Sequence, residues 1–339
     1  MKILEDVLIS KLTTMRLGGI AKYVIEIEDT EDLEKAYDFA KERDLSTFIL
    51  GGGANTIGLD EGFGGVILLN KLRGIEIVGE TNADVFVRGM GGEVWDDFVD
   101  FATERDLSGI EALSKIPGSL GAAPVQNIGA YGQEISQVIE NVEAYDTLLK
   151  KFVTIPKEDM QFRYRKSIFN NGETKGRYFI MAVTVKLAKN EQLTPPFYTS
   201  LQNYIDMHNI TDFSPKNIRL MVSEIRANKL PDPAEIASSG SFFKNVYVDD
   251  ERADELESRG VKIWRSGREN KINSGWLIED AGLKGKLLHG MRISEKAALV
   301  LINESAKSYE DLAAAREEIK NTIREKFDLE LEQEPVELK

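Results

Sequence analysis

Residues 116–132 read Ile-Pro-Gly-Ser-Leu-Gly-Ala-Ala-Pro-Val-Gln-Asn-Ile-Gly-Ala-Tyr-Gly, with four glycines, three alanines, two prolines and no charged side chain. This glycine-rich passage is too apolar for a solvated linker, and its glycines and prolines interrupt both helix and strand. Irregular apolar backbone must be buried against a partner that satisfies its N–H and C=O groups. We therefore expect a flat, polar-edged cofactor ring against the passage. A packed structural loop between domains is the alternative interpretation.

A second glycine motif, Leu50-Gly-Gly-Gly-Ala-Asn55, directly follows a predicted strand at 47–50. Glycine lets backbone N–H groups approach an anion without a Cβ in the way, so the motif fits a pyrophosphate cradle. An ordinary tight turn after a strand explains the same three glycines. The motif lacks the Gly-x-Gly-x-x-Gly spacing that opens a long helix, which disfavours a Rossmann fold.

Strands alternate with helices along the rest of the chain, which indicates an α/β or α+β organisation. Pro195-Pro196 breaks the chain before Phe197-Tyr198 and predicts an exposed loop. Pro231-Asp-Pro233 ends a helix with a basic face, because proline cannot continue a helix. The pattern predicts strands at 22–27, 47–50, 65–70, 84–90, 138–145, 178–187, 240–248 and 298–303, and helices at 29–43, 94–105, 215–230, 249–258, 274–281 and 309–327.

The composition excludes several classes of protein. The 339 residues include no cysteine and two histidines, which excludes disulfides and thiolate catalysis and argues against a metal site. A net charge of −14 argues against general affinity for nucleic acid or anionic membranes, so an anionic ligand needs a local positive site. The N-terminus lacks a signal-peptide pattern and no segment reaches ~20 uninterrupted apolar residues, so we expect a cytoplasmic protein with no membrane insertion.

The order of motifs along the chain resembles the UDP-N-acetylenolpyruvoylglucosamine reductase (UDP-N-acetylmuramate dehydrogenase) family. The resemblance implies an α+β protein with an FAD-binding fold of the vanillyl-alcohol-oxidase (PCMH) type. We expect FAD-binding subdomains at 1–70 and 71–212, a C-terminal α/β substrate domain at 213–330 and a tail strand at 331–339. Eight stretches carry the resemblance: Thr14–Gly19, Leu50–Asn55, the glycine-rich passage, Phe162–Phe169, Lys229–Pro233, Gly240–Asn245, Gly275–Ile278 and Ala298–Asn303.

The resemblance also implies a reaction. UDP-N-acetyl-3-O-(1-carboxyvinyl)-glucosamine is reduced to UDP-N-acetylmuramate for peptidoglycan synthesis, with non-covalent FAD as cofactor and NADPH as hydride donor. Another oxidoreductase of the same FAD-binding fold is the alternative, and a non-catalytic flavin-binding or nucleotide-sugar-binding protein is a third reading. The residues expected to hold the cofactor are Gly51, Gly52, Gly53, Ala54, Asn55, Pro117, Gly118, Ser119, Gly121, Ala122, Asn127, Ile128, Gly129, Ala130 and Tyr131.

The implied acceptor is an enol ether conjugated to a carboxylate, so hydride addition leaves negative charge on its α-carbon and carboxylate. Such chemistry needs a cation, a proton donor and a group that helps to hold the carboxylate. The resemblance assigns Arg165 as the cation, because its planar fork can bind both oxygens, and Ser241 as the proton donor. A solvated arginine and a turn serine are the alternatives. Glu334 is the expected catalytic carboxylate of the tail, with Glu332 as its competitor.

The resemblance further implies the residues that bind the UDP sugar. Lys229, Asn245 and Lys284 resemble the family's positive site for the diphosphate, although a lysine near a helix C-terminus also complements the helix dipole. Tyr164 is expected to contact the substrate. Tyr198 resembles the lid of the subgroup whose substrate loop carries a tyrosine. We expect the protein to act as a monomer.

Overall fold

The computed structural model describes residues 1–266 and 269–339, and it mixes helices and strands throughout. Contacts group the chain into two compact units. In the described residues, no helix is both long and apolar enough to cross a bilayer. The two units are a coarser division than the four domains predicted from the sequence, and those four domains remain a prediction. Unit 1 comprises Met1–Glu5, Tyr23–Gly52 and Gly64–Asn228, and unit 2 comprises Asp6–Lys22, Gly53–Phe63 and Lys229–Lys339.

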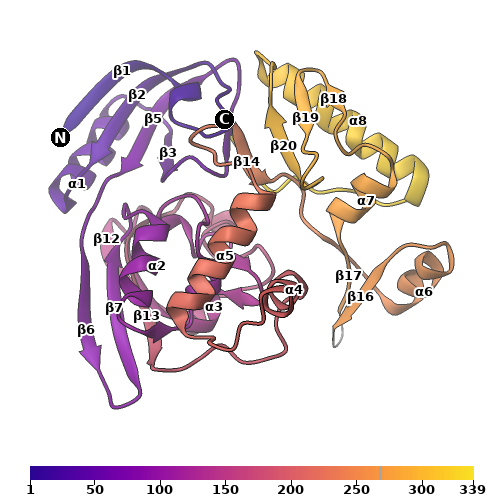
Figure 1. The fold of residues 1–339 in the computed structure, drawn as a ribbon. Helices are drawn as coiled ribbons and strands as arrows, with labels where there is room; N and C mark the ends of the chain where they lie inside the picture. The colour runs from indigo at the N-terminus through magenta and orange to yellow at the C-terminus, as the bar shows by residue number, and fades with distance from the viewer. Residues whose placement is uncertain (267–268) are drawn as a thin grey trace. The chain divides into compact units, whose positions relative to one another are not determined.

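The N-terminal sheet of unit 1 has the strand order β1-β2-β5-β3 (Figure 1). Helix α1 begins where the Asp29 carboxylate accepts a hydrogen bond from the Asp32 amide at 2.7 Å, which satisfies one of the free N–H groups of the first turn. Leu33 and Ala36 of α1 are buried in the core that the helix shares with this sheet. The elements are β1 (Lys2–Leu8), β2 (Ile20–Ile27), α1 (Thr30–Glu42), β3 (Thr47–Leu50) and β5 (Phe63–Asn70).

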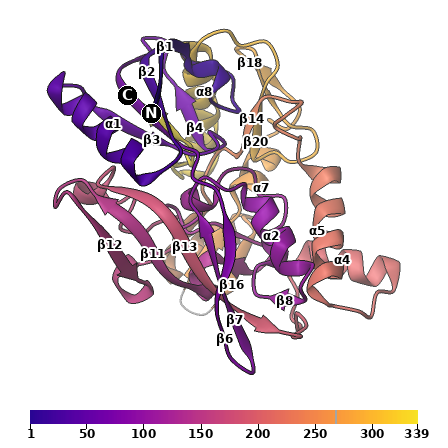
Figure 2. The same ribbon diagram turned by 90° about the vertical axis from the view of Figure 1, so that its left-hand side faces the viewer.

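A larger antiparallel sheet in unit 1 supports the glycine-rich passage. Its strand order is β12-β11-β13-β7-β6, with β8 pairing to β13 (Figure 2). Trp95 and Phe98 of α2 are fully buried in its core. The elements are β6 (Ile75–Glu80), β7 (Asp84–Met90), α2 (Trp95–Thr103), β8 (Leu107–Ser108), α3 (Ile135–Val138), β11 (Ile139–Asp146), β12 (Lys151–Pro156) and β13 (Tyr178–Lys189).

Two further helices, α4 (Thr199–His208) and α5 (Pro215–Lys229), add a small apolar cluster to unit 1. The predicted loop around Pro195-Pro196 is confirmed, but the sequence did not predict α4, which begins directly after it. The basic face of α5 is used in part against α2, where Arg219 forms an ion pair with Asp96.

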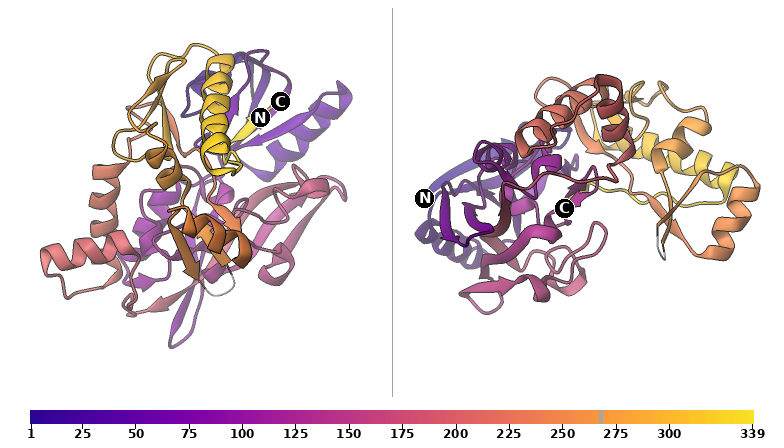
Figure 3. Two further views of the ribbon diagram at one scale, coloured as in Figure 1. Left: turned by 90° about the vertical axis from the view of Figure 1, so that its right-hand side faces the viewer. Right: turned by 60° about the horizontal axis from the view of Figure 1, so that its bottom comes forward.

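Unit 2 contains a sheet of order β14-β20-β19-β18, and α8 packs against β18 and β19 (Figures 1 and 3). Ser308 and Asp311 cap α8 reciprocally in a capping box. A second sheet, β15-β17-β16, lies beside α6, and β21 pairs in parallel with β4. The elements are β4 (Thr56–Gly58), β14 (Ser238–Ser241), β15 (Val246–Val248), α6 (Asp250–Ser258), β16 (Ile263–Ser266), β17 (Glu269–Ile272), α7 (Ser274–Asp280), β18 (Leu287–Leu288), β19 (Met291–Ile293), β20 (Val300–Asn303), α8 (Tyr309–Phe327) and β21 (Val336–Leu338).

Most of the predicted elements are confirmed, and those at 47–50, 84–90 and 309–327 agree with β3, β7 and α8 at both ends. The prediction of one strand over 240–248 was wrong. The chain forms β14 and β15 instead, because Phe242 and Phe243 between them are buried in the core of unit 2. The sequence did not predict strands β1, β4, β6, β8, β12, β16, β17, β18 and β19.

Candidate active site

Gly51 and Gly52 of the second glycine motif lie against the glycine-rich passage in unit 1. A Cβ atom on Gly52 would lie 2.9 Å from the Cα of Gly118, and one on Gly51 would lie 2.2 Å from the hydroxyl oxygen of Ser119. These distances leave no room for a side chain, so the close approach of the two backbones requires glycine. The structure thereby brings the residues predicted to hold a pyrophosphate to those predicted to hold a ring.

The boundary between the two units falls inside the second glycine motif, between Gly52 and Gly53. Gly53 has a φ of +65°, and a Cβ there would lie 2.0 Å from the carbonyl oxygen of Leu12 in unit 2. The carbonyl of Asn55 accepts a hydrogen bond from the amide of Val336 at 2.9 Å. Unit 2 therefore uses this half of the motif to pack its own backbone and to hold its C-terminal tail.

The beginning of the glycine-rich passage is hydrogen-bonded to the segment that leads into α2. We expected a cofactor to supply the partners of this backbone, and for these groups that expectation was wrong, because protein atoms supply them. The passage is also not wholly buried, since Pro117 and Ala122 are exposed. The backbone bonds are Trp95 N to Gly118 O at 3.0 Å, Leu120 N to Glu93 O at 2.8 Å and Gly121 N to Gly91 O at 2.8 Å.

The end of the passage forms a tight hairpin between β9 (Gly129–Ala130) and β10 (Gln133–Glu134). Tyr131 and Gly132 at its tip have φ angles of +50° and +90°, as a type I′ turn requires. The buried side chain of Asn127 donates a hydrogen bond to the Glu134 carboxylate at 2.8 Å. The Asn127 side chain thus shapes the hairpin.

Arg165 lies in a two-residue turn that is closed by reciprocal backbone hydrogen bonds between Arg163 and Lys166. Its guanidinium group donates to the carbonyl of Gly129 at 3.3 Å and lies 5.2 Å from the centre of the Tyr164 ring. Unit 1 therefore brings together the predicted catalytic arginine, a predicted substrate-binding tyrosine and the glycine-rich passage.

Tyr131 and Tyr198 make an edge-on contact with their ring centres 5.8 Å apart. The first was predicted to bind the cofactor and the second the substrate. Arg226 of α5, which sequence reasoning missed, is hydrogen-bonded to Tyr131. Burial lowers the pKa of Arg226, and the contact with Tyr131 opposes that shift. The basic face predicted for this helix was the signal in the sequence that pointed to it.

The surroundings of Ser119 fit a flavin dinucleotide. Its hydroxyl oxygen is buried, and among the residues that the structure describes none provides it with a hydrogen-bonding partner. A buried polar atom without a partner costs about 1–3 kcal/mol, and a phosphate or ring heteroatom of a dinucleotide would remove that cost. Together with the close backbone approach at Gly52 and Gly118, this hydroxyl fits FAD.

In unit 2, Ser241 ends β14 directly before the buried Phe242 and Phe243. The amide of Glu334 donates a hydrogen bond to the carbonyl of Phe242 at 2.9 Å, and Phe243 pairs in antiparallel fashion with Gln333. The C-terminal tail therefore runs alongside the segment that follows Ser241. Two residues predicted to be catalytic, 93 positions apart in the chain, thus lie on neighbouring stretches of backbone.

The two glutamates that competed for the catalytic role have different environments. Glu332 is exposed and forms an ion pair with Lys244, whereas Glu334 is half-buried. Lys244 therefore balances the charge of Glu332, in a surface contact of a kind that contributes little stability. The side chain of Asn245 accepts a hydrogen bond from the amide of Ser274 at 3.3 Å, which holds it near the start of α7.

Of the two remaining predicted cations, Lys229 is exposed and Lys284 is half-buried. Lys229 is the exposed last residue of α5, and Lys284 forms an ion pair with Glu279 at 2.7 Å. Arg165 belongs to unit 1, while Ser241 and Glu334 belong to unit 2. The convergence of these three side chains on one acceptor stays a prediction.

Comparison with known proteins gives the family. Residues 232–338 match the family described as the C-terminal domain of UDP-N-acetylenolpyruvoylglucosamine reductase, and residues 21–151 match the family described as an FAD binding domain. The crystal structure of the corresponding reductase from Thermus caldophilus, 23% identical in sequence, superposes over 100% of both chains with a TM-score of 0.69. The predicted α+β, FAD-binding fold is thereby confirmed.

Proteins named UDP-N-acetylenolpyruvoylglucosamine reductase are similar along almost the whole chain. The protein from Aliivibrio fischeri is 35% identical over 98% of this chain and 94% of its own length. The protein from Bdellovibrio bacteriovorus is 35% identical over 97% of both. With two matched domains and relatives aligned from end to end, this chain belongs to the UDP-N-acetylenolpyruvoylglucosamine reductase family.

Proposed function

We propose that this protein reduces UDP-N-acetyl-3-O-(1-carboxyvinyl)-glucosamine to UDP-N-acetylmuramate in peptidoglycan synthesis, with NADPH as hydride donor and FAD as cofactor. The observation that carries the proposal is the pairing of the tail at Glu334 with the residue after Ser241, in a chain of this reductase family. That pairing sets a carboxylate-bearing residue and a hydroxyl-bearing residue on adjacent backbone in unit 2.

Bound FAD would accept hydride from NADPH and pass it to the acceptor. In unit 1, Gly52 is exposed and has no side chain that would obstruct a dinucleotide, and the Ser119 hydroxyl, which lacks a partner among the described residues, is proposed to hydrogen-bond it. The other residues proposed to contact the cofactor are Gly51, Gly53, Ala54, Asn55, Pro117, Gly121, Ala122, Asn127, Ile128, Gly129, Ala130 and Tyr131.

Arg165 is proposed to hold the acceptor's carboxylate. Its contact with the Gly129 carbonyl fixes one edge of the guanidinium group, and a planar fork suits a two-oxygen anion. Ser241 is proposed to give its proton to the α-carbon. A serine hydroxyl is a weak acid, so it needs neighbouring groups that stabilise the alkoxide while it is reprotonated. Glu334, whose backbone is held beside Ser241's own strand, is proposed as the third group that acts on the acceptor.

The UDP sugar is proposed to bind through Tyr164, Tyr198, Lys229, Asn245 and Lys284. Tyr198 stands directly before α4 and contacts Tyr131 edge-on, which supports membership of the subgroup whose substrate loop carries a tyrosine. We also propose that the protein acts as a monomer in the cytoplasm.

The test is a pair of stopped-flow half-reactions on Ser241→Ala. NADPH should reduce the flavin of this variant as in the wild type, while reoxidation by the enolpyruvyl sugar should slow by several orders of magnitude, because the proton donor is lost. Ser258→Ala is the matched control, since it removes the hydroxyl of an exposed serine of unit 2 that donates to the carbonyl of Glu255 within α6. It should leave both half-reactions within about twofold of wild type.

Normal reoxidation of Ser241→Ala would reject the assigned proton donor. If the enolpyruvyl sugar fails to reoxidise the flavin of the wild type, the reaction itself is wrong, and another oxidoreductase activity of the same fold takes its place. Release of NADP⁺ and formation of UDP-N-acetylmuramate in equal amounts would establish the reaction directly.

A further inference from the structure

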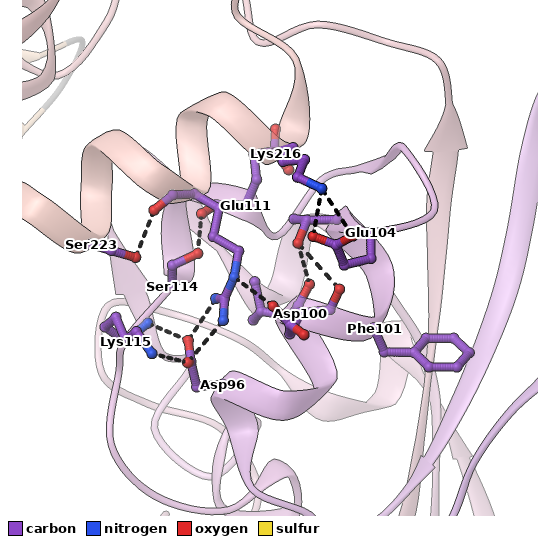
Figure 4. Close-up of polar contacts among 12 residues, drawn as sticks. Asp96, Asp100, Phe101, Glu104, Glu111, Ser114, Lys115, Lys216 and Ser223 are labelled. Atoms are coloured by element: carbon purple, nitrogen blue, oxygen red, sulfur yellow. Dashed lines mark hydrogen bonds and ion pairs between the residues drawn. The ribbon is translucent and has the colours of Figure 1, made fainter.

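The carboxylate of Asp96, in the first turn of α2, binds two separate segments of unit 1 (Figure 4). It accepts two parallel hydrogen bonds from the guanidinium group of Arg219 on α5, at 2.7 and 2.9 Å. It also accepts one bond from the backbone amide and one from the side-chain amine of Lys115, each at 2.7 Å. The Asp96 and Arg219 side chains are only 16% and 13% exposed, so this is a largely desolvated, bidentate contact of the strong kind.

Lys115 is the residue immediately before the glycine-rich passage, and its backbone has a left-handed φ of +60°. A non-glycine residue occupies this conformation at some cost, so the Asp96 carboxylate helps to hold the chain in it. Trp95, the residue before Asp96, makes a further contact: its ring N–H donates a hydrogen bond to the carbonyl of Leu113 at 2.8 Å. The start of α2 therefore fixes the entrance of the passage.

Helix α5 reaches the other end of the same passage. Arg226 follows Arg219 by seven residues, which is about two helical turns, so both side chains project from the same side of α5. Arg219 holds Asp96, and Arg226 is hydrogen-bonded to Tyr131 in the hairpin that closes the passage. One side of α5 is thus linked through Asp96 to Lys115, directly before the passage, and through Arg226 to Tyr131 at its end.

We propose that Asp96 is a positioning residue of the cofactor site, which keeps the glycine-rich passage and α5 in the arrangement that receives the flavin. The proposal rests on the proposed function. A segment rich in glycine is flexible on its own and loses much conformational entropy when it is ordered. Ordering it before the ligand arrives lowers the cost of binding, which is the advantage of a preorganised site.

A second ion pair between the same two helices provides a control. Lys216 of α5 pairs with Glu104, the residue after α2, and both side chains are more than half exposed (Figure 4). Such a surface pair contributes little. Lys216 and Glu104 both lie outside the glycine-rich passage, and their ion pair involves neither Lys115 nor Asp96. It joins α2 to α5 as Asp96 does, but without the link to Lys115.

The experiment compares Asp96→Asn with Glu104→Gln as full-length holoproteins. Unbound flavin is removed, the protein is diluted, and the rise of flavin fluorescence is followed as FAD dissociates. Asp96→Asn should release FAD at least about tenfold faster than wild type, and Glu104→Gln should stay within about twofold. With FAD added in excess, Asp96→Asn should recover kcat to within about twofold, because the positioning residue does not touch the reacting atoms.

A purely stabilising role gives a different result. Asp96→Asn would then lower the thermal unfolding temperature but release FAD at the rate of Glu104→Gln, and this outcome overturns the proposal. If Asp96→Asn does not fold, Arg219→Lys takes its place, because it keeps the charge and loses the bidentate geometry.

The flavin-release assay tests the role of Asp96 independently of the proposed function. It reports how tightly the cofactor is held, whatever the acceptor is. The proposed function is rejected if the enolpyruvyl sugar does not reoxidise the wild-type flavin. Even then, the rates of FAD release from Asp96→Asn and Glu104→Gln can still be compared.

Discussion

The backbone amide of Glu334 donates a hydrogen bond to the carbonyl of Phe242, 2.9 Å away, and so ties the C-terminal tail to the residue that follows Ser241. The next pairs along, Phe243 with Gln333 and the Lys244 amide with the Glu332 carbonyl, continue this short antiparallel contact. These bonds use backbone atoms only. The side-chain carboxylates of Glu332 and Glu334 take no part in them and can therefore have different environments and roles.

Replacing Glu334 should affect turnover far more than replacing Glu332. Glu334→Gln keeps the shape and the backbone bond but loses the charge, so we expect kcat to fall by about two orders of magnitude or more. Glu332→Gln only breaks an exposed ion pair with Lys244 and should change kcat by less than about threefold. Steady-state kinetics with saturating NADPH measures both. A larger loss for Glu332→Gln would transfer the catalytic assignment to that residue.

Arg165→Lys should slow the second half-reaction selectively. Lysine keeps the positive charge but cannot offer the two parallel donors of a guanidinium group. We expect reoxidation of the flavin by the enolpyruvyl sugar to slow by roughly a hundredfold, with reduction by NADPH nearly unchanged. Stopped-flow absorbance of the flavin separates the two steps. An equal loss in both steps would show that Arg165 supports the fold of the passage and does not hold the acceptor.

Gly52→Ala should weaken the binding of FAD. The added Cβ would lie 2.9 Å from the Cα of Gly118, a backbone atom that cannot move aside without shifting the passage. Gly64→Ala is the control, because a Cβ there meets no atom within 4 Å. The control should be neutral, or more stable by about 0.4–1 kcal/mol, through lower entropy of the unfolded chain. The ratio of flavin to protein absorbance after purification reports the result, and full flavin content in Gly52→Ala would contradict the close approach.

Glu337 of β21 should make the stability of unit 2 depend on acidic pH. Burial alone would raise the pKa of Glu337, but hydrogen bonds from Lys339, Tyr309 and Arg316 outweigh it and lower the pKa from 4.5 to about 2. A depressed carboxyl pKa contributes stability that is fully present above 4.5 and is lost as the pH falls through about 2.

Glu337→Gln should therefore unfold at a lower urea concentration than wild type near neutral pH, and the difference should narrow between about pH 4.5 and pH 2. Urea titrations at neutral pH and at about pH 3, followed by tryptophan fluorescence, measure it. A difference that stays the same at both pH values would show that packing, and not the charge, makes the contribution of Glu337.

Local patterns in the sequence determined much of this protein. The bounds of β3, β7 and α8 follow from apolar periodicity and capping, which act within a few residues. The sequence also marked Gly51–Gly53 and the glycine-rich passage as special backbone, but only the structure showed that Gly52 and Gly118 approach each other. For the catalytic carboxylate, the sequence favoured Glu334 by its position after the last helix and left Glu332 as a competitor.

Only the tertiary structure decided which distant residues meet. Asp96 pairs with Arg219 across 123 positions of the chain, and the Glu334 amide reaches the carbonyl of Phe242, the residue after Ser241, across 92 positions. It also showed that protein atoms, and not a cofactor alone, satisfy the backbone at the start of the glycine-rich passage. Such contacts depend on how whole elements pack against each other. They could not be predicted from the sequence, because a hydrogen bond or ion pair between residues far apart in the chain produces no periodic pattern in the residues around either partner.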